Sequence, residues 1–189
     1  MGVDPGLTRC GVGIVRGGVG TPLELLGVGV IRTPSDLDHG ARLLCIHDGL
    51  EEWFDAHHPD AMAVERVFAQ HNRSTVAGTA QAMGLTQMIG ARHGVAVGVH
   101  TPSEVKAAIS GSGRADKAQV GLMVARVLHL EKPPTPADAA DALALAITHI
   151  WRGGTQSRIE AAMAVHQHSP ARTWRQRSAP RTRQEHHLR

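Results

Sequence analysis

The amino-acid sequence predicts a mixed α/β domain over residues 1 to about 152, followed by a basic tail over residues 153–189. Three observations lead to this prediction. Short apolar stretches with glycine-rich links follow one another up to residue 33, as in antiparallel strands. Helical patterns then alternate with strands that are apolar at every position, as in a parallel sheet buried on both faces. After residue 153 the chain is too rich in Arg, Gln, His, Ser and Pro to bury a core, so we expect most of this tail to be flexible.

The first three strands are expected to form an antiparallel meander. Gly2–Asp4 is short and apolar until its final carboxylate, and Pro5 and Gly6 interrupt it. Strands over Gly11–Val15 and Leu23–Ile31 follow after glycine-rich links.

A helix should come next, because Thr33-Pro34-Ser35 can cap it and apolar residues from Leu43 to Phe54 recur at helical spacing. It should end near His57-His58-Pro59, before a buried strand over Ala61–Val64. The alternation then continues to the end of the domain. The remaining expected elements are a helix over Asn72–Arg92, a strand over Val95–Val99, a short helix capped by Thr101, a helix over residues 116–129 and a helix from Thr135 to about Trp151.

Composition limits the class of protein. A hydrophobic share of 42% in 189 residues is sufficient for a core. Cys10 and Cys45 have no CxxC spacing, which favours reduced thiols and a cytoplasmic protein. No stretch approaches the ~20 apolar residues of a membrane span, and the chain opens on MGVDPG without the pattern of a signal peptide.

Charge is distributed unevenly along the chain. The tail holds seven Arg against two Glu, a net charge of +5, whereas residues 1–152 hold 13 basic against 15 acidic residues, a net charge of −2. Inside the domain, residues 66–117 carry six basic against two acidic residues, and a positive segment of this kind favours contact with nucleic acid. The basic residues of this segment are Arg66, Arg73, Arg92, Lys106, Arg114 and Lys117.

Four carboxylates lie where carboxylates are costly. Asp4 and Glu65 each end an apolar strand, where ligands of α/β sheets gather. Asp4 by itself can also be a turn-initiating residue, because Asp-Pro-Gly commonly starts turns. Glu65 directly follows a fully buried strand, and a desolvated carboxylate needs a partner.

Asp138 and Asp141 begin an almost entirely apolar helix and, three residues apart, share one face. Complementation of the helix dipole explains Asp138 but not the second like charge. Four carboxylates in one pocket cannot all stay ionised without cations. Two Mg²⁺ ions would balance the four charges, bind the hard oxygen ligands that they prefer, and clamp the oxygens of a phosphoryl displacement.

The motifs Gly2-Val3-Asp4-Pro5-Gly6, Val64-Glu65-Arg66-Val67-Phe68, Lys106, Asp116-Lys117-Ala118-Gln119-Val120 and Ala137-Asp138-Ala139-Ala140-Asp141-Ala142-Leu143 resemble, in order and spacing, those of the RuvC family of bacterial Holliday-junction resolvases. The resemblance covers residues 1–152. It implies a ribonuclease-H-like fold, with a five-stranded mixed sheet flanked by α-helices. Two departures are a short first strand and an Arg-rich tail longer than the family requires.

The same resemblance implies a crossover junction endodeoxyribonuclease of homologous recombination and DNA repair. Such an enzyme is a homodimer that nicks four-way junction DNA symmetrically with Mg²⁺, for which Mn²⁺ substitutes, and the RuvA–RuvB branch-migration complex is its partner. The catalytic and metal-binding residues would be Asp4, Glu65, Asp138 and Asp141. Phe68 would stack on a base, although a core Phe is the ordinary reading, and Lys106 and Lys117 would contact phosphates. Arg66, Arg73 and Arg114 complete the expected DNA-binding set.

Three alternatives remain open from the residues. An actin-like or sugar-kinase ATPase shares the Asp-x-Gly fragment, but such folds need about twice this length. A non-catalytic junction-binding module would not require all four acids. A ribonuclease acting on RNA–DNA hybrids shares the acidic site and differs only in substrate. The thirteen histidines include no HxxxH pair, so we do not expect a histidine metal site.

Overall fold

The computed structural model describes residues 1–67 and 73–164, except for the side chains of residues 73–75 and 153–164. The chain divides into two compact units, Met1–Gly154 and Thr155–Arg189, and the description that follows concerns the first. The final part of the expected tail, from residue 165, lies outside the described residues.

The five strands form one mixed sheet in the order β3-β2-β1-β4-β5. Its members are β1 (Gly2–Asp4), β2 (Arg9–Arg16), β3 (Glu24–Arg32), β4 (Met62–Glu65) and β5 (Val97–His100). The first three strands pair antiparallel, whereas β4 pairs in parallel with β1 and β5. The sequence prediction of a meander followed by parallel strands is confirmed, and with it the expected fold class.

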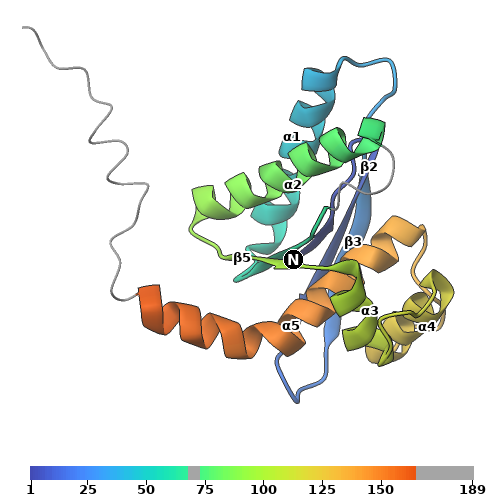
Figure 1. Cartoon of the computed structure of the whole chain (residues 1–189), viewed down its shortest axis with the longest axis vertical. Coiled ribbons are helices and arrows are strands. Elements are labelled where there is room, and N and C mark those ends of the chain that lie inside the picture. Colours follow the sequence, from blue (N-terminus) through green and yellow to red (C-terminus); the bar gives the residue numbers. More distant parts are fainter. Residues whose placement is uncertain (68–72, 165–189) are drawn as a thin grey trace, which may run out of the picture. The chain divides into compact units, whose positions relative to one another are not determined.

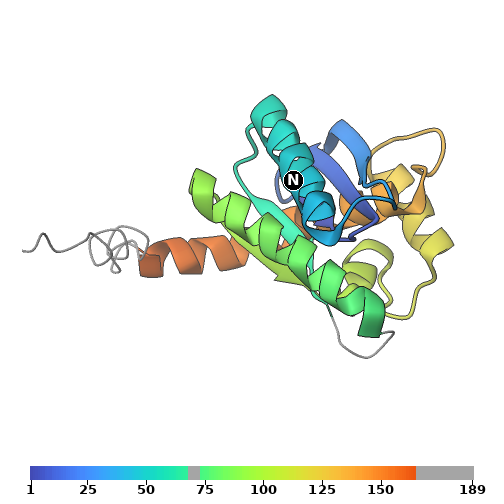
Figure 2. The same ribbon diagram turned by 90° about the horizontal axis from the view of Figure 1, so that it is seen from above.

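Helices cover both faces of this sheet (Figures 1 and 2). On one face α1 (His39–His57) and α2 (Arg73–His93) bury Ile46, Leu50 and Ile89 against Val3 and Val12. On the other face lie α3 (Pro102–Ser110), α4 (Lys117–Val127) and α5 (Ala137–Ala164), whose core includes Val105, Val124, Leu143 and Ile147. Each face therefore has its own apolar core, with the sheet between them.

Two helix boundaries differ from the sequence prediction. The first helix begins at His39, with Asp38 as its N-cap, and not beside Thr33. The Thr33 hydroxyl donates a hydrogen bond to the Leu7 carbonyl and accepts one from Arg42 Nε, so this residue holds a loop instead.

The second difference is α5, which begins at Ala137 and runs on to Ala164, past the expected end at Trp151. The segment after Gly154 contains Ile159, Glu160 and Ala161 to Ala164. Most of these are good helix formers, which outweigh the cost of two glycines in the middle of the helix.

Close packing of α5 on the sheet depends on glycine at two positions. A Cβ atom on Gly2 would collide with the backbone oxygen of Ala142, and one on Gly11 would collide with that of Asp138. Any larger side chain would therefore push α5 away from β1 and β2. This contact places the first turn of α5 beside the end of β1.

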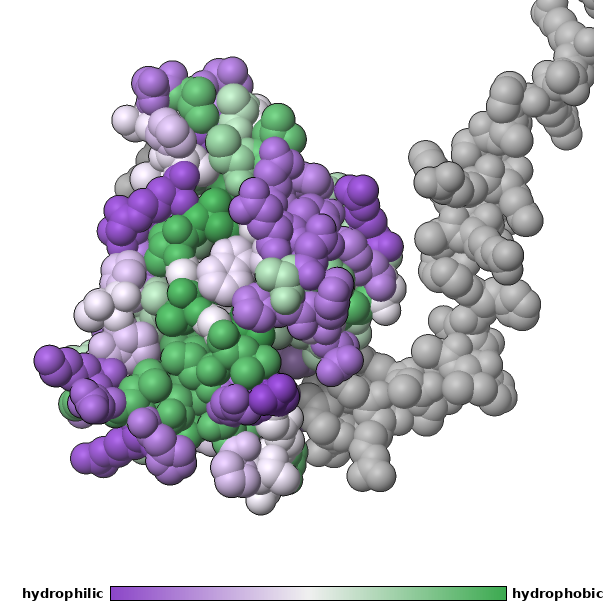
Figure 3. Space-filling view, turned by 180° about the vertical axis from the view of Figure 1, so that it is seen from behind, coloured by the Kyte–Doolittle hydropathy of each residue, from purple (hydrophilic) through white to green (hydrophobic). Residues whose placement is uncertain are grey.

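The surface seen from behind the view of Figure 1 carries a broad apolar area bordered by polar side chains (Figure 3). Exposed large apolar side chains include Leu26 and Val28 on the edge strand β3. None of the helices within the described ranges is long and apolar enough to cross a membrane.

Candidate active site

Asp4 and Glu65 are the last residues of two adjacent parallel strands. Val3 of β1 lies opposite Val64 of β4, so the carboxylates that follow these residues emerge at the same edge of the sheet. The carboxyl ends of parallel strands are where α/β sheets bind ligands. Both strands are buried up to these final residues, which leaves the two acids at the border between core and solvent.

The first turns of α5 bring Asp138 and Asp141 to the same edge. Their side chains are 27% and 25% exposed, while Ala139, Ala140 and Ala142 between and after them are buried. Charge interactions link both residues to Asp4. We call this group of four carboxylates, Asp4, Glu65, Asp138 and Asp141, the acidic edge.

Burial and the neighbouring negative charges make Asp4 and Glu65 bind protons more strongly than free carboxylates do. Burial, followed by the charges of Glu65, Asp141 and Asp138, raises the pKa of Asp4 from 3.8 to about 8. Burial and the charge of Asp141 also raise the pKa of Glu65, against the opposite effects of Lys117 and a hydrogen bond with Asp4. Carboxylates in this state either share protons or require a cation.

Two basic side chains already supply part of that positive charge. Lys117 Nζ donates a hydrogen bond of 2.7 Å to Asp141 Oδ2, which raises the pKa of Lys117. Arg9 Nε lies 2.7 Å from Asp138 Oδ2. That Asp138 oxygen is buried and nevertheless has no aligned hydrogen-bond partner, so its contact with Arg9 is an ion pair of poor geometry.

Arg9 was not among the residues expected from the sequence. The sequence feature that could have pointed to Arg9 is its position, five residues after Asp4 and at the start of the strand that pairs with β1. Nothing in the local pattern distinguishes it from an ordinary strand-end arginine. Only the packing of α5 on β2 places its guanidinium beside Asp138.

A pocket of about 190 Å³ opens beside two of the four acids. Its lining combines Glu65 and Asp141 with the two expected phosphate-binding lysines, Lys106 and Lys117, and with the apolar residues Pro102, Val105, Val120 and Leu145. Lys117 is 72% exposed, so its ammonium group can also reach a ligand outside the pocket. Negative and positive groups thus lie in one small cavity. Its carboxylates could bind a metal ion, and its lysines could bind the phosphate of a substrate.

The other expected DNA-binding residues are more scattered. Arg66 follows β4 directly and is exposed, with its backbone N–H donating to the His100 carbonyl. Arg114 lies in the loop between α3 and α4 and lines a second, more open cavity. Arg73 begins α2, but its side chain is not described. Phe68 lies outside the described residues.

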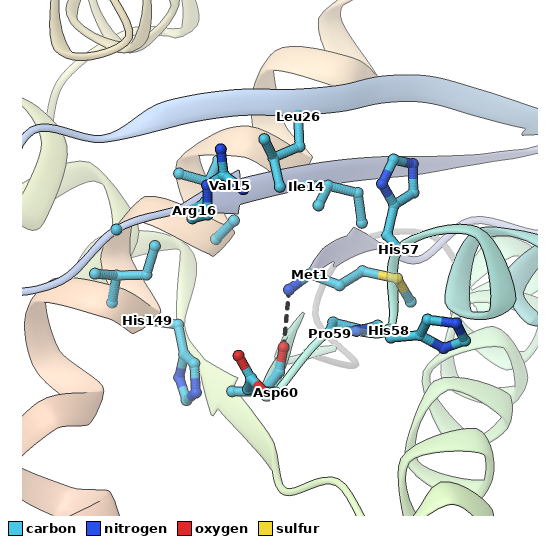
Figure 4. Close-up of a pocket in the computed structure, with 14 residues that line it drawn as sticks. Met1, Ile14, Val15, Arg16, Leu26, His57, His58, Pro59, Asp60 and His149 are labelled. Carbon is cyan, nitrogen blue, oxygen red and sulfur yellow. Dashed lines mark hydrogen bonds between the residues drawn. The ribbon is translucent and has the colours of Figure 1, made fainter.

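A further cavity of about 330 Å³ lies at the opposite end of β1, away from Asp4 (Figure 4). It is lined by Met1, His57, His58, Asp60 and His149, among others, and the Met1 amine donates a hydrogen bond to the Ala61 carbonyl. Burial lowers the pKa of this amine to about 6 and, with the charge of His100, that of His149 to about 4. No member of the acidic edge lines this cavity.

Within the described residues, one group of three or more candidate ligands has its ligand atoms within 4.8 Å of one another, and it is not the acidic edge. It consists of Glu51, Asp55 and His93, on α1 and α2. Sequence reasoning missed it, because no HxxxH pair marks it and its histidine comes from another helix. The protein therefore offers candidate metal ligands at two places.

Comparison with known proteins finds a matching family model and similar relatives. A family model described as "Crossover junction endodeoxyribonuclease RuvC" matches residues 1–149. The protein of that name from Cutibacterium acnes is 75% identical over 165 residues, which is 87% of this chain and 84% of the relative. The one from Streptomyces avermitilis is 61% identical over 166 residues, 88% of this chain and 94% of the relative.

The structure is also similar to a solved one. A T. thermophilus RuvC, determined in complex with a Holliday junction substrate, superimposes with a TM-score of 0.77 at 33% identity. The match covers 82% of this chain and 94% of that chain.

Proposed function

Since the chain belongs to the RuvC family of crossover junction endodeoxyribonucleases, we propose that it cuts four-way junction DNA by paired, symmetric nicks at the acidic edge. One observation supports this most directly. Four carboxylates from three separate elements converge at the carboxyl end of β1, and burial, together with the charges of the other three, raises the pKa of Asp4 to about 8. Such a group of carboxylates must either hold protons or bind a cation, and a divalent cation is the ligand that leaves all four ionised.

The residues fit a divalent metal with a preference for oxygen. All four are carboxylates, and Asp138 retains a buried oxygen without a hydrogen bond. We propose that Asp4, Glu65, Asp138 and Asp141 hold two Mg²⁺ ions, for which Mn²⁺ can substitute. Such ions supply charge stabilisation to the attacking and leaving oxygens of a phosphodiester displacement.

The remaining side chains of the site would bind and orient DNA. Lys106 and Lys117 line the pocket beside Glu65 and Asp141, so their ammonium groups can bind phosphate oxygens next to the scissile bond. Arg66 and Arg114 extend the positive surface away from it. Arg73 and Phe68 remain in the proposed set from the family resemblance, Phe68 as the side chain that stacks on an exposed base.

Two symmetric nicks need two sites, so we propose a homodimer with α2 at its centre. Met88 on α2 is 47% exposed, and a Cβ atom on Gly84 would meet no other atom within 4 Å. The RuvA–RuvB complex would be the partner in recombination and repair, and the cytoplasm the place of action, as the family resemblance implies. Gly84→Arg should give monomers in analytical ultracentrifugation, while the matched control Leu44→Arg, on exposed α1 surface, should not.

The proposed activity can be tested directly with the purified full chain. It is incubated with Mg²⁺ and a labelled four-way junction, a plain duplex or an RNA–DNA hybrid, and the nicks are mapped. We expect paired nicks at symmetric positions in the junction, and none without metal. Comparable cutting of the hybrid would instead favour a ribonuclease, and junction binding without any cutting would favour a non-catalytic module.

A further inference from the structure

A second group of metal-ligating side chains lies between α1 and α2, on the face of the sheet that α5 does not cover. Glu51, Asp55 and His93 present ligand atoms within 4.8 Å of one another. His47 lies next to this group, with its Nε2 atom 3.6 Å from Glu51 Oε1, although only the other three residues have all their ligand atoms within 4.8 Å of one another. We call His47, Glu51, Asp55 and His93 the α1–α2 cluster.

The helical register explains why three of these residues meet. His47, Glu51 and Asp55 are spaced four residues apart on α1, so they form one row on its surface. His93 comes from the last turn of α2, and its Nε2 atom lies 2.6 Å from Glu51 Oε2. The His93 ring stacks on Phe54, with centroids 3.9 Å apart, and this contact holds it facing the row.

The partner of His47 orients its ring as well. Its Nδ1 atom lies 2.8 Å from Asp48 Oδ1. An Nδ1–H that donates to this carboxylate leaves the Nε2 lone pair directed toward Glu51. Metal-binding histidines almost always have such a carboxylate or carbonyl behind them, because it fixes the tautomer and increases the basicity of the ligand.

Glu51 itself lacks a complete set of partners. Its side chain is 17% exposed, and its Oε1 atom is buried without a hydrogen-bond partner among the described residues. This oxygen makes two long ion-pair contacts, with His47 Nε2 at 3.6 Å and with Arg92 Nη1 at 3.4 Å. A buried carboxylate oxygen held only by long ion-pair contacts would be stabilised further by a cation that binds it directly.

The geometry points to a Zn²⁺ site in the α1–α2 cluster, and we propose that this ion joins α1 to α2. One imidazole nitrogen, from His93, and two carboxylate oxygens, from Glu51 and Asp55, form a mixed set that suits Zn²⁺, with the His47 imidazole beside them as a further nitrogen donor. An all-oxygen set suits Mg²⁺ instead. The two charges of Glu51 and Asp55 match those of the ion. Arg92 is 64% exposed and can move aside when the ion binds.

Binding at this site would be separate from catalysis. Its ligands belong to helices of the opposite face, and none of them lines the pocket that contains Glu65 and Asp141. A Zn²⁺ ion held by both helices would oppose their separation and so stabilise the folded protein by mass action. The inference does not depend on the proposed nuclease activity.

The test is a titration of the metal-free full chain with Zn²⁺, in competition with a chromophoric chelator. The protein carries Asp141→Asn, so that the acidic edge contributes as little as possible. We expect one tight equivalent that raises the melting temperature. Glu51→Gln, His93→Gln and Asp55→Asn should each weaken it at least ~10-fold, and Asp48→Asn, which removes the group behind His47, should weaken it by about 10-fold.

Two matched controls identify the ligands. His39→Gln removes another exposed α1 histidine, which contacts Gln81 and not the cluster, and replacing His166, His168, His186 and His187 by Gln removes the histidines of the tail. Both proteins should keep the tight equivalent. With Co²⁺ as probe, the visible absorption of a four-coordinate nitrogen–oxygen site should appear in the controls and disappear in His93→Gln.

The proposal is overturned if the wild-type cluster and the Glu51→Gln, His93→Gln and Asp55→Asn variants bind Zn²⁺ equally. It is also overturned if the tail replacement abolishes the tight equivalent. Asp55 is exposed, so its variant is expected to fold even if substitution at Glu51 perturbs the helix pair. Circular dichroism of each metal-free variant provides the check on folding.

Discussion

The acidic edge and the α1–α2 cluster both concentrate negative charge, but they neutralise it in different ways. At the acidic edge the charges of three carboxylates act on Asp4, and the long side chains of Arg9 and Lys117, 42% and 72% exposed, supply positive charge from outside. In the α1–α2 cluster two imidazoles stand among the carboxylates. An all-oxygen site with displaceable basic side chains suits a hard ion such as Mg²⁺ that also binds a substrate phosphate. A site with nitrogen and oxygen ligands suits a structural ion such as Zn²⁺.

The largest expected difference between the two sites is in catalysis. Asp141→Asn should lower the rate of junction cleavage by ~10³-fold or more, because each metal contributes several kcal/mol to the transition state. Glu51→Gln should leave the rate within about twofold. Gel-shift titration should show that both variants still bind the junction. Loss of binding in step with cutting in a folded Asp141→Asn protein would contradict the metal role of Asp141.

Next in size is the effect of pH on the stability of the metal-free protein. The pKa of Asp4 in the folded protein, about 8, lies above its ordinary value of 3.8, so between these values the folded protein holds more protons than the unfolded chain. The contribution of Asp4 to the free energy of unfolding is therefore fully present below pH 4 and is lost as the pH rises toward 8. Asp4→Asn in EDTA should melt several degrees above the wild type at pH 8.

The same two proteins supply the control. At pH 5 Asp4 is protonated in the folded wild type, so the difference in melting temperature should become small. Saturating Mg²⁺ at pH 8 should raise the melting temperature of the wild type more than that of Asp4→Asn. A difference independent of pH would mean that the charge of Asp4 is not the source of the effect.

A smaller effect should come from the basic side chain beside Asp138. Arg9 occupies one of its oxygens in the metal-free protein, so Arg9→Gln should increase the affinity for Mn²⁺. Ion pairs with this exposure contribute ~0.2–1 kcal/mol, which corresponds to an increase of about 1.4- to fivefold. Titration followed by electron paramagnetic resonance measures it, and a weaker affinity would show that Arg9 supports the metal site instead.

The smallest effect concerns the basic tail, whose residues are part of neither the acidic edge nor the α1–α2 cluster. Residues 165–189 carry six Arg against one Glu, so their removal should flatten the dependence of duplex binding on salt. Each phosphate that the shortened protein no longer neutralises reduces the slope of log affinity against log salt by about 0.9. Cleavage of the junction should continue. Equal slopes for full-length and shortened protein would show that residues 165–189 do not contact DNA.

Much of the fold was predictable because it is encoded locally. The glycine-rich links between the first strands, the all-apolar strands over residues 61–64 and 95–99 and the cap at Thr101 each specify an element within a few residues. The expected meander, the parallel strands and the short helix are all present. Boundaries were less reliable. Thr33 is of a residue type that commonly caps helices, yet its hydroxyl donates a hydrogen bond to the carbonyl of Leu7, a residue 26 positions away.

The sequence by itself indicated which carboxylates are candidates for the site, because Asp4, Glu65, Asp138 and Asp141 each stand against apolar surroundings that make a charge costly. Only the tertiary structure decided what lies beside them. Arg9 reaches Asp138 because Gly2 and Gly11 let α5 pack directly on the sheet, and His93 reaches Glu51 because α1 and α2 pack side by side. The cost of burying a charge can be predicted from the sequence, because it depends on the apolar residues directly before and after the charged one. The partner that relieves this cost comes from a distant segment, and its position depends on how the helices pack.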